Sequence, residues 1–131
     1  MLGTHDHSDH IDPATLPLLT AASPQARVVV PRPAQARVAA LVGDPARVIG
    51  AAVDEPMVLG PVEVIPIPAQ HEEFDHHPVL GYPYLGYVLR FDALTIYNAG
   101  DTIPYEGLVE RLRPLEIDLA LLPINGRDFF R

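Results

Sequence analysis

Four side chains that can bind a metal ion lie within six positions near the start of the chain. In an extended segment, side chains two residues apart project to the same side, so His5 and His7 can bind one cation together. Asp9 and His10 follow where the chain must turn into a helix start, and that bend can direct both toward a second, adjacent cation. Imidazole and carboxylate are ligands suited to zinc, iron or manganese. The cluster therefore predicts a metal centre rather than a solvated histidine-rich terminus.

The composition excludes several other kinds of site. The 131 residues include no cysteine, which rules out disulfide scaffolds, thiolate zinc sites, iron–sulfur clusters and cysteine nucleophiles. The net charge is −8, and no basic stripe occurs, so we expect neither nucleic acid nor an anionic membrane as a partner. No apolar run is long enough to span a bilayer, and no signal peptide precedes the histidines. These features indicate a globular, cytoplasmic protein.

The hydrophobic pattern predicts an α/β fold of short elements joined by rigid turns, consistent with fifteen prolines. Three consecutive valines in 26–30 are typical of a buried strand in a parallel or mixed sheet. Prolines 61, 66 and 68 predict that strand 62–68 is an edge or irregular strand. The expected helices are 13–22, 33–42 and 104–112, and the expected strands are 26–30, 47–49, 57–59, 62–68, 84–91, 94–98 and 117–124.

The histidine cluster resembles a known family signature. Thr4-His5-Asp6-His7-Ser8-Asp9-His10 matches the T-H-x-H-x-D-H motif of the metallo-β-lactamase superfamily, and residues 4–12 resemble its L-ascorbate-6-phosphate lactonase-like branch. Two later segments agree in order. Ala69-Gln70-His71 is similar to the third histidine motif, and Asn98-Ala99-Gly100-Asp101-Thr102 is similar to the G-D-[ST] motif. The resemblance implies an αββα sandwich.

The resemblance also implies a centre of two divalent metal ions, with zinc as the first expectation and manganese or iron as alternatives. Such cations acidify water, to a pKa of about 7 in zinc sites, and polarise a carbonyl or phosphoryl oxygen. Asp9 would also orient the attacking water or pass a proton to the leaving group, and Gly100 would let the backbone approach the centre. The implied ligands are His5, His7 and His71 for one cation, Asp9 and His10 for the other, and Asp101 between the two.

Other polar side chains have two interpretations each. Arg127 could pair with an anionic substrate group, with Asn125 beside it in the segment 122–128 that resembles the lactonase-like branch, or it could be a surface charge. His76 and His77 fit either a solvated loop or a substrate contact. Asp6 either orients a ligand imidazole or faces solvent. The tyrosines 82, 84 and 87 would line a pocket or form the packing face of a hairpin.

The sequence also departs from the family pattern. The superfamily places several strands before the T-H-x-H-x-D-H loop and a last ligand histidine well after the Gly126 region, whereas no histidine follows His77. Residues 1–131 thus read as a partial domain, truncated at both ends. We expect it to bind the first metal better than the second and to have little activity. Exposed sheet edges could pair two copies in a homo-oligomer.

Three functions follow from these residues. The first is a metal-dependent hydrolase of a small ester or lactone, anionic or phosphorylated. The second is a phosphodiesterase or nuclease of the same superfamily, which the acidic charge disfavours. The third is a truncated, non-catalytic metal-binding fragment.

Overall fold

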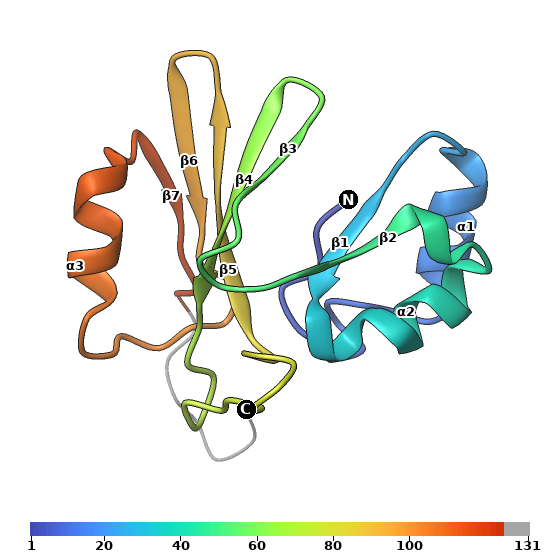
Figure 1. Ribbon diagram of the computed structural model, residues 1–131, viewed down its shortest axis with the longest axis horizontal. Coiled ribbons are helices and arrows are strands. Elements are labelled where there is room, and N and C mark those ends of the chain that lie inside the picture. Colours follow the sequence, from blue (N-terminus) through green and yellow to red (C-terminus); the bar gives the residue numbers. More distant parts are fainter. Residues whose placement is uncertain (125–131) are drawn as a thin grey trace.

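The computed structural model describes residues 1–124, so Asn125 and Arg127 lie outside the described residues. The elements form two sheets, a parallel pair β1-β2 and a five-stranded sheet in the order β3-β4-β5-β6-β7 (Figure 1). The helices are α1 (Thr15–Ala22), α2 (Gln35–Val42) and α3 (Leu108–Leu112), with 3₁₀ turns at Arg32–Ala34, Pro45–Arg47 and Arg113–Leu115. The strands are β1 (Val28–Pro31), β2 (Val48–Ala51), β3 (Met57–Leu59), β4 (Val62–Pro68), β5 (Leu85–Phe91), β6 (Leu94–Asn98) and β7 (Leu119–Leu121).

The two sheets lie between the helices, which gives the four layers of an αββα sandwich (Figure 1). Three separate apolar clusters fill the three spaces between the layers. Val28 and Val30 pack with α1 and α2, whereas Val29 between them packs with β3, β4 and β5. On the far face of the five-stranded sheet, Val88 and Tyr97 pack against α3. The alternation of side chains along each strand therefore confirms the predicted α/β sandwich.

The first strand fits its sequence closely. All four residues of β1 are buried, and it pairs in parallel with β2, as the run of valines predicts. Residues 1–3, which precede the histidine loop, are anchored on β1. Leu2 forms a parallel bridge with Val29, and the Gly3 amide donates to the Val29 carbonyl at 2.9 Å. The histidine loop therefore starts from a segment anchored on β1.

Proline positions produced one wrong expectation. β4 is not an edge strand, since it pairs with β3 on one side and β5 on the other. However, β3 contacts only Val62–Val64, so Pro66 and Pro68 lie where β4 is paired on one side alone. A missing N–H costs nothing there, which explains why an internal strand tolerates both prolines.

The last elements are shorter than the sequence predicts. The helix expected from Pro104 begins at Leu108, because Gly107 has a left-handed φ of 92°. The strand expected over 117–124 is shortened to β7, whose side chains are exposed and which, among residues 1–124, pairs only with β6. Pairing between copies through exposed sheet edges, which the sequence suggests without assigning it to a strand, stays a prediction.

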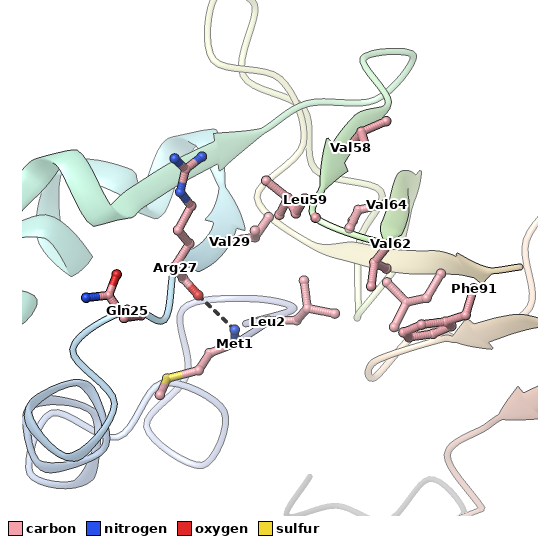
Figure 2. Close-up of a pocket in the computed structure, with 12 residues that line it drawn as sticks. Met1, Leu2, Gln25, Arg27, Val29, Val58, Leu59, Val62, Val64 and Phe91 are labelled. Atoms are coloured by element: carbon pink, nitrogen blue, oxygen red, sulfur yellow. Dashed lines mark hydrogen bonds between the residues drawn. The ribbon is translucent and has the colours of Figure 1, made fainter.

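An apolar groove of about 590 Å³ opens between the two sheets beside β1 (Figure 2). Leu2, Val29, Val64 and Phe91 line it, and the Met1 amino group beside it donates to the Arg27 carbonyl at 2.8 Å. None of the candidate metal ligands lies in its wall, so the predicted chemistry belongs elsewhere in the fold.

None of the helices in residues 1–124 has the length and apolar character that a bilayer crossing requires.

Candidate metal centre

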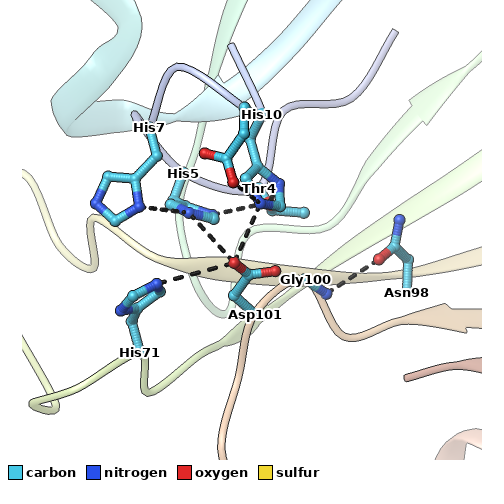
Figure 3. A network of polar contacts seen from close by, with 9 residues as sticks. Thr4, His5, His7, His10, His71, Asn98, Gly100 and Asp101 are labelled. Carbon is cyan, nitrogen blue, oxygen red and sulfur yellow. Dashed lines mark hydrogen bonds and ion pairs between the residues drawn. The ribbon is translucent and has the colours of Figure 1, made fainter. Parts of the chain in front are cut away.

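Three loops bring the candidate ligands together (Figure 3). The first carries His5, His7 and His10, and it folds back because the His7 carbonyl accepts hydrogen bonds from the His10 and Ile11 amides at 3.1 and 2.7 Å. The second follows β4 and carries His71, and the third follows β6 and carries Asp101. The sequence predicts this turn before His10 and both strand-end positions.

The side chains form two groups that could each hold a cation. His5, His7 and His71 make the first group, and His5, His10 and Asp101 make the second. Within each group the ligand atoms lie within 4.8 Å of one another. The first group has the predicted membership. The second contains His10 and Asp101 as predicted, but His5, expected only in the first group, takes the place expected for Asp9, which lies outside both groups.

Asp101 occupies the position between the histidines that the resemblance implies. Its Oδ2 lies 3.1 Å from Nε2 of His10, 3.8 Å from Nε2 of His71 and 3.9 Å from Nε2 of His5. Asp9 lies on the outer side, with its carboxylate 3.7 Å from His10 Nε2 and its side chain 77% exposed. One carboxylate is therefore central to the cluster and the other is accessible from solvent.

Thr4 orients two of the imidazoles. Its hydroxyl lies 3.0 Å from Nδ1 of His5 and 3.2 Å from Nδ1 of His10, and the residue is buried. A hydroxyl oxygen can accept an Nδ1–H from each ring, which leaves the Nε2 lone pair of both imidazoles free for a metal ion. Because both Nδ1 atoms are engaged by Thr4, both Nε2 atoms face Asp101. The sequence identifies Thr4 only as the first residue of the motif. The contact of its hydroxyl with both imidazoles is seen only in the structure.

The second and third loops are bonded to each other. The Gln70 amide donates to Oγ1 of Thr102 at 3.0 Å, and the Ile103 amide donates to the Gln70 carbonyl at 2.7 Å. In the same turn the Gly100 amide donates to the Asn98 side-chain oxygen at 3.0 Å (Figure 3). The residues next to His71 and Asp101 are thus fixed relative to one another.

The electrostatics of the cluster fit a bound cation. Burial, with smaller contributions in the same direction from the neighbouring His10 and His7, lowers the pKa of His5 to about 4. His5 is therefore neutral at neutral pH and keeps a lone pair for a metal ion. A hydrogen bond from its own backbone lowers the pKa of the Asp9 carboxyl, which keeps it ionised. Neutral imidazoles with carboxylates are the donor set that zinc, manganese and iron accept.

The remaining polar candidates lie outside both groups. Asp6 forms a two-point ion pair with Arg37 of α2, with Arg37 Nε at 2.6 Å from Asp6 Oδ2, which ties the histidine loop to the helix layer. His77 is exposed, and its Nδ1 accepts the amides of Val79 and Leu80 and so shapes its own turn. His76 packs its ring edge-on against Tyr82, with centroids 4.7 Å apart.

The sequence is similar to those of known metal-dependent hydrolases. A family model described as Beta-lactamase superfamily domain matches residues 1–129. A UPF0173 metal-dependent hydrolase of Nitratidesulfovibrio vulgaris is 30% identical over 135 residues, covering 96% of this chain and 51% of the relative. A UPF0173 metal-dependent hydrolase of Pyrococcus furiosus is 38% identical over 74 residues, covering 54% of this chain and 32% of the relative.

Solved structures show the same architecture. Igni18, a metallo hydrolase from the archaeon Ignicoccus hospitalis, superposes with a TM-score of 0.71 and 26% identity, covering 96% of this chain and 52% of its own. A putative metal-dependent hydrolase from Parabacteroides distasonis gives a TM-score of 0.70 at 22% identity, covering 96% and 53%. The chain spans about half the length of these proteins. The family model matches residues 1–129 and the fold agrees with it, so the chain belongs to the β-lactamase superfamily.

Proposed function

We propose that this chain carries the metal centre of a metal-dependent hydrolase that acts on a small ester or lactone, anionic or phosphorylated. The observation that supports this most directly is the placement of Asp101 Oδ2 within 3.9 Å of Nε2 atoms from three histidines on two other loops. Carboxylates and imidazoles converge in this way where they share metal ions. Its relatives are named metal-dependent hydrolases.

In this proposal the side chains have distinct parts. His5, His7 and His71 would hold one divalent cation, and His10 and Asp101 would hold the second together with Asp9, whose carboxylate lies 3.7 Å from His10 Nε2. Zinc is the first choice, and manganese or iron fits the same donors. When bound, the cations supply Lewis acidity and acidify water for attack on a carbonyl or phosphoryl centre.

The two carboxylates do different work because their surroundings differ. Asp101 Oδ2 lies 3.1 Å from His10 Nε2 and within 3.9 Å of Nε2 of His5 and His71, so this carboxylate is in reach of both groups. Asp9 projects from the turn between His7 and His10 and is exposed, so it can reach an incoming substrate. As an ionised carboxylate it can accept a proton from water and return it to the leaving group.

The substrate class that we propose is lactonase-like. Arg127 and Asn125 would bind the anionic group of the substrate through a guanidinium and an amide. Arg37 is not available for this role, since Asp6 already engages it. The chain is acidic and repels polyanions, so a large anionic substrate is disfavoured. A small lactone or ester with one carboxylate or phosphate group needs only one positively charged side chain, which Arg127 would supply.

The test is hydrolysis of a panel of lactones, carboxyl esters and phosphodiesters by the zinc-, manganese- or iron-loaded protein. We expect weak turnover of lactones or esters that is lost in Asp101→Ala, because the central carboxylate is gone. Asp75→Ala, which removes an exposed carboxylate outside both groups, should keep the wild-type rate. Equal activity in Asp101→Ala, or no hydrolysis with any metal, would contradict the proposal, and turnover of phosphodiesters alone would favour a phosphodiesterase.

A further inference from the structure

Tyr84 contacts every member of the first histidine group. Its ring stacks on His71, with centroids 5.2 Å apart and planes inclined by 27°. The same ring lies 5.4 Å from the His5 ring and 5.9 Å from the His7 ring. One aromatic side chain therefore forms a shared wall for imidazoles that come from two different loops.

The backbone at Tyr84 is bonded to both of these loops. Its carbonyl accepts the amide of Ala69, two residues before His71, at 3.0 Å. The next amide, that of Leu85, donates to the carbonyl of Thr4, immediately before His5, at 2.9 Å. The start of β5 thus spans the distance between the two ligand loops, and the ring projects from this span onto the imidazoles.

We propose that Tyr84 is a positioning residue for the first metal site, whose ring holds the imidazoles of His5, His7 and His71 in the orientations that bind one cation. The inference rests on the proposed function in that this group binds a metal ion. An imidazole that must lose rotamer freedom on binding gives a weaker site than one already packed in place. The ring, and not the hydroxyl, makes these contacts.

The test is a titration of the metal-free protein with Co²⁺, which reports affinity and ligand geometry through its visible absorption and needs no hydrolysis. Tyr84→Ala should weaken binding of the tighter cation by about 10- to 100-fold, the usual effect of losing a residue that supports a ligand, and should change the spectrum. Tyr84→Phe keeps the ring and should restore both the affinity and the spectrum. The backbone bonds of residue 84 remain in each variant.

Tyr82→Ala is the matched control. Its ring lies two residues earlier in the chain, packs with the apolar cluster between the sheets, and contacts Phe74 and His76 at 5.3 and 4.7 Å. This variant loses packing near the site but no contact with the first group, so its Co²⁺ affinity and spectrum should match the wild type. Circular dichroism and thermal unfolding establish that each variant is folded.

The outcomes separate the two proposals. Wild-type affinity and spectrum in Tyr84→Ala, or an equal loss in Tyr82→Ala, would overturn the role of Tyr84. Should Tyr84→Ala fail to fold, a weakened, altered Co²⁺ site in Tyr84→Leu would support the role, and an unchanged one would overturn it. If the wild-type protein binds Co²⁺ but hydrolyses nothing, only the proposed function is contradicted. If it binds no Co²⁺, both the proposed function and the role of Tyr84 are overturned.

Discussion

Gly100 lies so close to Thr4 that a side chain at this position would force the backbone or Thr4 to shift. A Cβ built on Gly100 would lie 2.9 Å from Cβ of Thr4 and 3.2 Å from its hydroxyl oxygen, and Gly100 also has a φ of +59°. Thr4 holds the rings of His5 and His10, and Asp101 follows Gly100 directly. The approach of the carboxylate to the imidazoles therefore depends on a missing side chain.

Gly100→Ala should be more destabilising than an ordinary substitution of a left-handed glycine. Gly60 has nearly the same φ, +62°, but nothing lies within 4 Å of its built Cβ, so Gly60→Ala isolates the backbone penalty of about 1 kcal/mol. Gly100→Ala adds a clash with Thr4 and should cost about 2–4 kcal/mol. Urea unfolding measures both, and Co²⁺ titration should show weaker binding in Gly100→Ala alone. Equal effects would show that the Thr4 contact is unimportant.

Thr102→Val should loosen the junction between the loops of His71 and Asp101. Thr102 is buried, accepts the Gln70 amide and donates to the Ile103 carbonyl at 3.0 Å. Without its oxygen the Gln70 amide loses its acceptor, which costs about 1–3 kcal/mol in the free energy of unfolding. Thr102→Ser keeps the oxygen and should behave like the wild type in urea unfolding. If valine and serine were equally stable, this hydrogen bond would not hold the junction.

Local sequence signals predicted most of the fold. The valine run gave β1, and Gly43 ends α2 with a left-handed φ of 73°, as a glycine after a helix predicts. The expectations that failed have different causes. The inner position of β4 depends on how far β3 extends, and the start of α3 depends on the left-handed Gly107 rather than on Pro104.

The sequence predicted which histidines come together, but not the contacts that support them. Spacing and motif order identified His5, His7 and His71, which the structure brings into one group. Contacts between distant residues carry no local signal, so the sequence did not show that Asp6 pairs with Arg37 or that Tyr84 stacks on His71. It also did not show that Asp9 would lie outside the two groups, since that depends on the tight turn at His7.

Arg37→Ala should affect the metal site more than the stability of the fold. Arg37 pairs with Asp6, which lies between His5 and His7, but both side chains are partly exposed, so the ion pair contributes less than about 1 kcal/mol. Losing it frees the histidine loop and should weaken Co²⁺ binding a few-fold. Arg32→Ala removes a comparable pair with Glu55, away from the candidate ligands, and should leave Co²⁺ binding unchanged. A similar loss in both variants would point to general charge effects.

Asp12 should make the stability of the chain depend on pH through the start of α1. Its carboxylate accepts the Thr15 amide at 2.6 Å, and the hydrogen bonds from Thr15 hold the pKa of Asp12 below its usual range. A lowered folded-state pKa means that this stabilisation is complete above the ordinary aspartate pKa of about 4 and is lost as the pH falls through the folded-state value. Asp12→Ala should therefore lower the Tm by a few degrees at pH 7, with the gap from the wild type closing in acid. Asp75→Ala, an exposed carboxylate without such a bond, should show no gap at either pH, and a pH-independent gap for Asp12→Ala would contradict the assignment.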